Sequence, residues 1–301
     1  MEFKQLEIFV ALAKTKSFSK AAQKLYLTQP AITNSLQKLE DSLGTTLVNR
    51  KTRQITLTES GQLLLQYAVS IINMRDQALF NLKEKQEAIS GNLELYASTI
   101  PAQYLLPKLV KDFCICYPQV NVSIRHADSL QVADDILQGF SNLGLVGSYH
   151  DSESLLYHPL MDDKVVLITS SQRQIDHKKT FPSIQDLVGE TLILREEGSG
   201  TRKILEQVLS QKNLDLSCFQ HINQVENNET IKNMVALDLG VSFVSELSIQ
   251  NELSLGILNA YSMEDLSLDR CFYLVYTATR HLSPVEASFK NFVLNQFHQL
   301  S

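Results

Sequence analysis

Polar side chains that can read a nucleic-acid base gather on one face of a predicted helix. That face carries Gln29, Pro30, Thr33, Asn34 and Gln37. The carboxamide of Gln or Asn can form two hydrogen bonds with adenine, and Thr or Pro can contact the methyl group of thymine. Such residues near a helix N-terminus are typical of recognition in the DNA major groove. The alternative interpretation is an ordinary solvated polar face.

Basic side chains that suit phosphate contacts lie close to this helix in the sequence. Lys38 is on the helix itself, and Arg50, Lys51 and Arg53 follow it. Contacts between such cations and phosphates fix the register of a protein on DNA but do not read its sequence. We therefore expect these four residues to position the helix rather than to select bases.

A second group of polar residues follows the carboxyl ends of predicted strands, where α/β folds bind ligands. Helix N-termini there offer free backbone N–H groups and a positive dipole, which suit a small anion. Because Glu197 and Glu226 would oppose an anion, a zwitterion is the alternative. A plainer interpretation is that the Ser and Thr residues only cap helices. The candidates are Ser98, Thr99, Asp128, Ser129, Ser148, Ser199, Gly200, Thr201, Arg202 and Glu226.

The elements that carry the first group read as a winged helix-turn-helix. Apolar residues at helical spacing predict helices over 3–13 and from about 18 to 25. Thr28 and Pro30 begin a third helix, and Gly44 ends it. Two short strands, 48–50 and 54–57, then flank a basic tip. Three helices followed by a β-hairpin place the second and third helices on DNA.

The segment from about 59 to 90 predicts one long helix, because residues 62–90 contain neither Gly nor Pro. Apolar residues spaced by four and three form an imperfect heptad interrupted at Arg75 and Lys85. We interpret it as a dimerisation helix whose seam is partly covered by other surfaces. The alternative is a helix buried within its own domain.

The remaining residues, 91–301, alternate between strand and helix patterns, which predicts α/β units with mainly parallel sheets. Periodicity does not decide between one lobe and two. The strands are expected at 93–97, 120–125, 143–146, 165–169, 191–194, 219–225, 241–244 and 270–276, and the helices at 105–116, 130–138, 201–211, 228–237 and 284–299.

Charge is distributed unevenly between the two ends of the chain. Residues 1–58 hold nine Lys or Arg against four acids, whereas the whole chain has a net charge of -6. The remaining residues therefore carry 18 basic and 29 acidic side chains. A basic N-terminal module on an acidic body indicates that only the N-terminus meets a polyanion.

Several classes of protein are disfavoured by what the sequence lacks. The N-terminus has no secretory signal pattern, and no apolar run reaches the length of a membrane span, so we expect a cytoplasmic protein without a membrane partner. The four cysteines have no metal-binding or redox spacing, so no metal and no cofactor are expected. Catalytic signatures such as a P-loop or a nucleophile elbow are missing, which argues against an enzyme.

The first 60 residues resemble the LysR-type transcriptional regulators in order and spacing. The resemblance is carried by Phe18-Ser19-Lys20-Ala21-Ala22, Thr28-Gln29-Pro30-Ala31-Ile32-Thr33, Leu39-Glu40, Leu43-Gly44, Leu47-Val48-Asn49-Arg50 and Leu57-Thr58-Glu59-Ser60-Gly61. The departures, Thr28, Val48 and Ser60 at positions where Ser, Phe and Ala are commoner, are mild. The segment 97–107 also looks like family members tied to sulfur, cysteine or selenium metabolism.

This resemblance implies an α/β effector domain of two lobes, similar to a periplasmic solute-binding protein, with a small-molecule effector between them. The implied domains are 1–58 for DNA binding, 59–90 for the linker and 91–301 for the effector. Lobe one would comprise 91–162 and 269–301, and lobe two 163–268, with a hinge near Asp163 and Leu268. Family members usually form homodimers that pair into homotetramers.

The sequence therefore predicts a DNA-binding transcriptional regulator that is modulated by an anionic or zwitterionic effector. One alternative is an architectural DNA-binding protein with a ligand-free body. Another is a small-solute receptor without DNA function, which would leave the first 60 residues unexplained.

Overall fold

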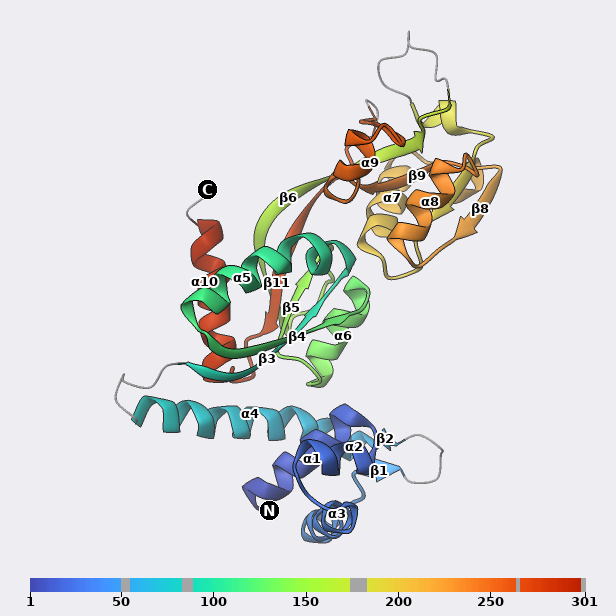
Figure 1. Cartoon of the computed structure of the whole chain (residues 1–301). Helices are drawn as coiled ribbons and strands as arrows, with labels where there is room; N and C mark the ends of the chain where they lie inside the picture. Colours follow the sequence, from blue (N-terminus) through green and yellow to red (C-terminus); the bar gives the residue numbers. More distant parts are fainter. Residues whose placement is uncertain (50–54, 83–88, 174–182, 264–265, 299–301) are drawn as a thin grey trace.

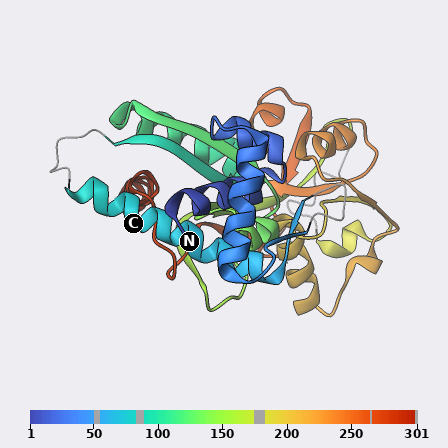
Figure 2. The same ribbon diagram turned by 90° about the horizontal axis from the view of Figure 1, so that it is seen from below.

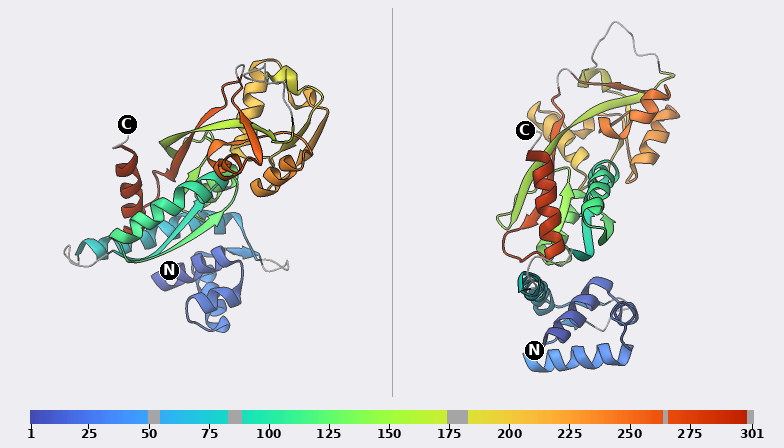
Figure 3. Two further views of the ribbon diagram at one scale, coloured as in Figure 1. Left: turned by 45° about the horizontal axis from the view of Figure 1, so that its top comes forward. Right: turned by 60° about the vertical axis from the view of Figure 1, so that its left-hand side comes forward.

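The computed structural model describes residues 1–49, 55–82, 89–173, 183–263 and 266–298. The N-terminal domain, one long helix and two α/β lobes follow one another from bottom to top (Figure 1). The same order is visible after rotation in the right-hand view of Figure 3. The predicted fold class, a winged helix-turn-helix, a linker helix and a two-lobed α/β domain, is confirmed.

The N-terminal domain forms because local capping and an apolar stripe agree. The Ser17 hydroxyl accepts from the Lys20 amide and the Thr28 hydroxyl accepts from the Ala31 amide, so both caps hold the first turns of their helices. Gly44, with φ of 65°, ends the third helix in the left-handed conformation. The elements are α1 (Phe3–Thr15), α2 (Phe18–Lys24), α3 (Gln29–Leu43), β1 (Val48–Asn49) and β2 (Thr56–Leu57).

The linker helix α4 (Glu59–Leu82) has three faces. One face buries Leu65, Ala68 and Val69 in the core of the N-terminal domain. A second face carries Gln66, Ser70 and Asn73 toward lobe one. The third face leaves apolar side chains exposed, among them Leu63, Tyr67 and Met74.

One feature of the predicted linker differs from the structure. Ser90, predicted as the end of the helix, begins the first strand of lobe one, and residues 83–88 lie outside the described residues. The cover predicted over part of the heptad seam is present, since Ala68 is buried and Arg75 forms an ion pair with Glu7 at 2.8 Å. The N-terminal domain supplies this cover, which a sequence pattern does not show.

Lobe one places helices on both faces of a sheet. Helices α5 and α10 cover one face, where Phe113 and Phe289 meet edge to face with ring centroids 5.1 Å apart. Helix α6 covers the other face through Val132 and Ile136. The elements are β3 (Ser90–Ala97), a π-helical turn (Pro101–Leu105), α5 (Leu106–Cys116), β4 (Gln119–His126), α6 (Ser129–Gln138), β5 (Leu143–Val146), the first half of β6 (Leu155–Ser170), β11 (Asp269–Thr277) and α10 (Pro284–His298).

Lobe two is built on the second half of β6 and has two apolar cores. One packs Leu205 and Leu209 of α7 against Leu192 and Phe243, and the other packs Ile231 of α8 against Ile193. The elements are three short 3-10 helices (Ile184–Leu187, Leu216–Cys218 and Glu246–Ser248), β7 (Thr191–Leu194), α7 (Gly200–Gln211), β8 (His221–Gln224), α8 (Asn228–Ala236), β9 (Ser242–Ser245), α9 (Gln250–Ser254) and β10 (Leu258–Tyr261).

The predicted mainly parallel arrangement is wrong, because the described sheets are mixed. β3 pairs in parallel with β4 and β5, and β7 with β8, but β6 pairs antiparallel with β9, β10 and β11, and β5 with β11. The chain crosses to lobe two on β6 and returns on β11, so these two strands must run in opposite directions. Strand β10, helix α9 and the full length of β6 were not predicted.

The N-terminal domain and α4 lie in front of lobe one when the molecule is viewed from below (Figure 2), and both contact it directly. The Lys14 ammonium lies 3.1 Å from the Glu94 carboxylate on β3. The Asn73 side chain on α4 donates to the carbonyl of His281 at 2.7 Å. These contacts join the two parts of the chain at the base of lobe one.

No described helix is long and apolar enough to cross a membrane.

Candidate functional site

Helix α3 presents its polar face to solvent at the outer end of the N-terminal domain. Gln29, Pro30, Asn34, Gln37 and Lys38 are exposed, whereas Ile32, Leu36 and Leu39 are buried beneath them. Figure 1 shows α3 at the lower edge of the molecule, away from both lobes. The predicted base-reading residues therefore share one accessible surface.

Local contacts hold the start of this helix. The Ser19 hydroxyl on α2 donates to the Gln29 side-chain oxygen at 3.1 Å, and the Thr33 hydroxyl donates to the Gln29 carbonyl at 3.1 Å. The Thr33 side chain is half-buried. The predicted phosphate contacts Arg50, Lys51 and Arg53 lie outside the described residues.

A polar pocket lies between the two lobes, at the carboxyl ends of β3, β5 and β7. Its volume is about 10 Å³, which is the room needed for a single water molecule. A larger ligand therefore requires the lobes to separate. The lining consists of Ser98, Thr99, Ile100, Pro101, Asp128, Ser129, Gly147, Arg195, Ser199, Gly200, Thr201 and Arg270.

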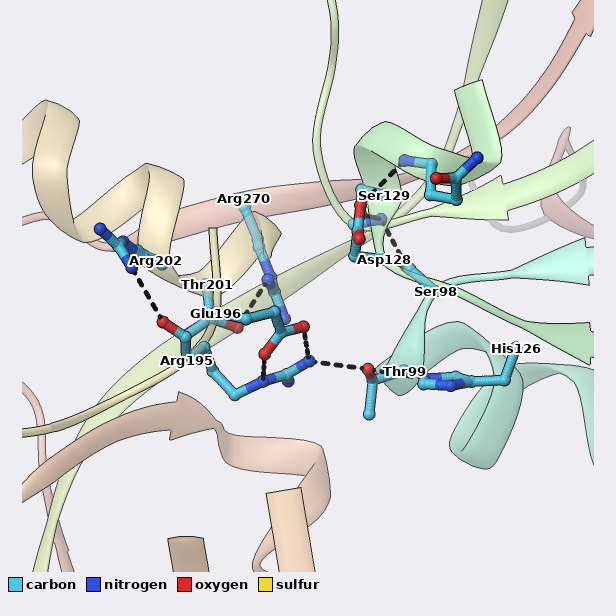
Figure 4. Close-up of polar contacts among 12 residues, drawn as sticks. Ser98, Thr99, His126, Asp128, Ser129, Arg195, Glu196, Thr201, Arg202 and Arg270 are labelled. Atoms are coloured by element: carbon cyan, nitrogen blue, oxygen red, sulfur yellow. Dashed lines mark hydrogen bonds and ion pairs between the residues drawn. The ribbon is translucent and has the colours of Figure 1, made fainter. Parts of the chain in front are cut away.

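Arg195 bridges the two lobes across this pocket. Its guanidinium donates at 3.0 Å to the Thr99 hydroxyl of lobe one, and also pairs with Glu196 at 2.7 Å (Figure 4). The Thr99 hydroxyl also lies 3.0 Å from Nε2 of His126. A further hydrogen bond between the lobes runs from the Tyr104 hydroxyl to the Ser248 carbonyl at 3.3 Å. These contacts hold the lobes together.

A buried ion pair lies at the hinge beside the pocket. Nε of Arg270 on β11 donates to Asp163 on β6 at 2.8 Å, and the other Asp163 oxygen accepts from the Ser245 hydroxyl at 2.6 Å. Nη1 of Arg270 donates to the Thr201 hydroxyl at 3.0 Å. Burial lowers the pKa of Arg270, although Asp163 opposes this shift. Nη2 of Arg270 is buried and has no hydrogen-bond partner among the described residues.

Two helix N-termini face the same space but are used differently. At α6 the Asp128 carboxylate accepts from the Gln131 amide at 2.8 Å and caps the helix. At α7 the Ser199 side chain forms no capping hydrogen bond. The first N–H groups of α7 therefore contribute their positive dipole to the pocket without a side-chain acceptor.

Two glycines permit the close approach of the lobes. A Cβ on Gly198 would lie 2.7 Å from a carboxylate oxygen of Asp128, and a Cβ on Gly200 would lie 2.9 Å from the Gly147 carbonyl oxygen. Both contacts join lobe two to lobe one. Neither position accepts a side chain while the lobes are in this arrangement.

The structure brings most of the predicted ligand residues together. Seven of them line the inter-lobe pocket: Ser98, Thr99, Asp128, Ser129, Ser199, Gly200 and Thr201. Ser148 lines a neighbouring pocket. Arg202 and Glu226 are not part of this lining: Arg202 pairs with Glu206 at 2.7 Å, and Glu226 is exposed.

Sequence reasoning missed Arg195 and Arg270. Arg195 directly follows β7, so the rule that ligands lie beyond strand ends could have identified it. Arg270 was the first residue of a predicted strand, and only its pairing with β6 brings it beside Asp163. Within the described chain, no group of three metal-binding side chains is present.

Two known families match the chain, one over the N-terminal domain and the start of α4 and the other over the two lobes. Residues 3–62 match the family described as "Bacterial regulatory helix-turn-helix protein, lysR family". Residues 86–298 match the family described as "LysR substrate binding domain".

Curated relatives match almost the whole chain. A "Probable RuBisCO transcriptional regulator" of Cyanophora paradoxa is 32% identical over 97% of this chain and 91% of its own length. The "HTH-type transcriptional activator CmpR" of Synechocystis is 31% identical over 96% of this chain and 93% of its own length. Neither name supports the predicted sulfur, cysteine or selenium branch.

Solved structures share the fold at lower identity. A full-length OxyR variant from Pseudomonas aeruginosa has a TM-score of 0.78 and 21% identity over 97% of this chain and 93% of its own. The CcmR regulatory domain of Synechocystis, in complex with 2-PG, has a TM-score of 0.61 and 24% identity over 69% of this chain and 98% of its own.

Proposed function

Because the chain belongs to the LysR family of bacterial transcriptional regulators, whose members bind DNA and respond to small-molecule effectors, we propose that its inter-lobe pocket binds an effector that carries an oxyanion group. The effector is then an organic anion or a zwitterion. Its binding changes the relative position of the lobes, and through lobe one the placement of the N-terminal domains on promoter DNA.

For DNA recognition we propose that α3 enters the major groove and that Gln29 and Asn34 read base edges. Both side chains are exposed on the same face, beyond a buried stripe that fixes their orientation. Pro30, Thr33 and Gln37 would add further base contacts, and Lys38, Arg50, Lys51 and Arg53 would contact phosphates. Each dimer then spans two half-sites about one helical turn, or a multiple of it, apart.

The DNA assignment is tested by genome-wide capture of bound DNA, followed by titration of the recovered operator at fixed salt. We expect Gln29→Ala combined with Asn34→Ala to abolish the sharp sites but to leave weak, salt-sensitive binding. A matched control is Gln250→Ala, an amide on α9 of lobe two. Unchanged operator binding by the double variant would contradict the assignment.

The observation that carries the effector proposal is the unpartnered Nη2 of Arg270. A guanidinium donates through five N–H groups, and a buried one left without an acceptor costs free energy. A carboxylate or phosphate oxygen at this position satisfies Nη2 and lies beside the uncapped N-terminus of α7. It can also accept from Arg195 in place of the Thr99 hydroxyl.

We expect the effector to bind in two steps, an opening of the lobes followed by their closure. Since the pocket holds only about 10 Å³, the Arg195–Thr99 contact must open before an effector enters. The lobes then close on the ligand, which bridges Thr99 and Ser98 of lobe one to Arg195 and Thr201 of lobe two. The effector thus selects a distance between the lobes.

Isothermal titration of the full chain tests the pocket. The first ligands to try are 2-PG and shikimate, because regulators of the same fold were solved with them. We expect Thr99→Ala and Thr201→Ala to weaken effector binding, and Thr230→Ala on α8 to leave it unchanged. Equal affinities of the first two variants and the unaltered protein would refute the pocket.

We further propose that the chain forms a homodimer through the third face of α4, and that dimers pair into a homotetramer. Leu63, Tyr67 and Met74 are spaced by four and seven residues on one side of the helix and are each at least half exposed. Analytical ultracentrifugation tests the proposal: Tyr67→Glu should lower the oligomeric state. A variant that sediments like the unaltered protein would contradict it.

The remaining assignments follow from this function. We propose the predicted domain bounds, except that Ser90 belongs to β3; the described part of the linker helix spans Glu59–Leu82. We place the protein in the cytoplasm, where its DNA lies, and propose no catalytic role for the pocket. The sulfur branch stays a prediction without support from the relatives named above.

A further inference from the structure

A second pocket of about 410 Å³ lies beside the hinge and shares Gly147, Gly200 and Arg270 with the effector pocket. This volume is within the range of small-molecule sites. Cys271 and Tyr273 of β11 line it, and they alternate along the strand with the buried Phe272. We call it the hinge pocket.

One wall of the hinge pocket is aromatic. The rings of Tyr149 and Tyr157 lie 4.7 Å apart between centroids, and those of Tyr157 and Tyr273 lie 5.8 Å apart. Tyr149 and Tyr273 line the pocket directly, and Ile204 of α7 faces it from lobe two. These side chains offer a flat apolar surface that suits an aromatic or large aliphatic group.

Opposite charges flank this apolar wall. Lys203 of α7 lines the pocket and donates to the Tyr149 carbonyl at 2.7 Å. Its ammonium also lies 3.4 Å from Nδ1 of His150, and within the described chain Lys203 forms no ion pair, so the third of its N–H donors can reach a ligand carboxylate. The carboxylates of Asp151 and Asp269 also line the pocket, and both are exposed.

We propose that the hinge pocket binds an α-amino acid with an aromatic or other large apolar side chain. The ligand carboxylate pairs with Lys203, its ammonium faces Asp151 and Asp269, and its side chain packs on Tyr149 and Tyr273. A purely anionic ligand could pair with Lys203, but it would leave Asp151 and Asp269 without a positive partner from the ligand. A purely cationic one would leave Lys203 unpaired.

The hinge pocket joins the same parts of the molecule as the effector pocket. Tyr149 and Asp151 belong to lobe one, whereas Lys203 and Ile204 belong to lobe two. A ligand that bridges them changes the free energy of lobe closure, and by reciprocity it changes effector affinity. Binding itself does not rest on the effector assignment; only the coupling does.

Calorimetric titration of the full chain tests the site with phenylalanine, tyrosine, tryptophan, leucine and methionine as probes. At least one is expected to bind. Two analogues of the best binder are then tested, one without the ammonium and one without the carboxylate. We expect each to bind at least about tenfold more weakly, since each has lost one charge-assisted contact. For phenylalanine these analogues are 3-phenylpropanoate and phenethylamine.

Variants separate this pocket from the effector pocket. Lys203→Met and Tyr273→Ala should weaken binding about tenfold, whereas Lys108→Met, an exposed lysine on α5, should not change it. Thr99→Ala should leave amino-acid binding intact even if the effector assignment fails. The proposal is overturned if no probe binds, if both pocket variants bind like the unaltered protein, or if 3-phenylpropanoate binds as well as phenylalanine.

Discussion

The DNA-reading face and the inter-lobe pocket are built in opposite ways. The face belongs to one helix of 15 residues, and its side chains are exposed on a buried stripe. The pocket takes residues from the ends of β3, β5 and β7, from two helix N-termini and from β11. The two arginines of the pocket, Arg195 and Arg270, are buried, and each contacts a partner from another segment.

Because of this difference, we expect substitutions in the two regions to affect the stability of the fold differently. Substitutions on the α3 face remove contacts that form only with DNA, so the fold is expected to tolerate them. Substitutions in the pocket also remove partners that keep buried charges satisfied. The following predictions test how far the two regions are independent, beginning with the largest effect.

Arg270→Gln is expected to destabilise the chain by about 3–5 kcal/mol, because Asp163 would lose its buried counter-charge. The Asp163 side chain is fully buried, so water cannot replace the guanidinium. Chemical denaturation followed by circular dichroism measures the loss. Arg125→Gln, which breaks an exposed pair with Glu94, is the control and should cost at most about 1 kcal/mol. If both variants lost the same free energy of unfolding, the expected difference between the buried and the exposed ion pair would be wrong.

Gly200→Ala is expected to disfavour the closed lobes by about 1–3 kcal/mol, since its Cβ would lie 2.9 Å from the Gly147 carbonyl oxygen. The lobes should then stay apart, with lower effector affinity and a larger radius of gyration in small-angle scattering. Non-specific DNA binding should persist, because α3 is remote. Ser210→Ala at the exposed end of the same helix serves as the control. Unaltered scattering would show that the glycine contact does not limit closure.

The ion pair between the N-terminal domain and lobe one, Lys14–Glu94, should contribute least, up to about 1 kcal/mol. Burial raises the pKa of Glu94, but Lys14 and Arg125 outweigh it and hold this pKa below its ordinary value of 4.5. The stabilisation is therefore complete above pH 4.5 and is lost as the pH falls through the lower, folded value. Unfolding midpoints of the unaltered chain and Glu94→Gln should differ at pH 7 and converge under acid. If the difference between the two midpoints stayed the same at both pH values, the titration of Glu94 would not be its cause.

Much of the N-terminal domain was predictable because its signals are local. Ser17 and Thr28 cap the helices, Gly44 ends α3, and the buried stripe fixes which side chains face outward. The predicted residues Ser98, Thr99 and the 199–201 segment also lie at the pocket, because they follow the carboxyl ends of strands that pair in parallel, β3 in lobe one and β7 in lobe two.

The partners of buried groups could not be predicted in this way. Arg270 appeared only as the first residue of a strand, and its role depends on the antiparallel pairing of β11 with β6. Arg202 looked equally suited to an anion, yet the helical turn directs it to Glu206. Nothing in the local pattern distinguishes these two guanidinium groups.

By itself, the sequence determined the caps of α2 and α3 and the polar face of α3, since each depends on residues within a few positions of one another. Only the tertiary structure decided which face of α4 stays free, which strands pair antiparallel and which charges meet at the hinge. These features depend on contacts between segments far apart in the chain. Burial then sets their energies, because an ion pair such as Arg270–Asp163 stabilises or destabilises according to what surrounds it.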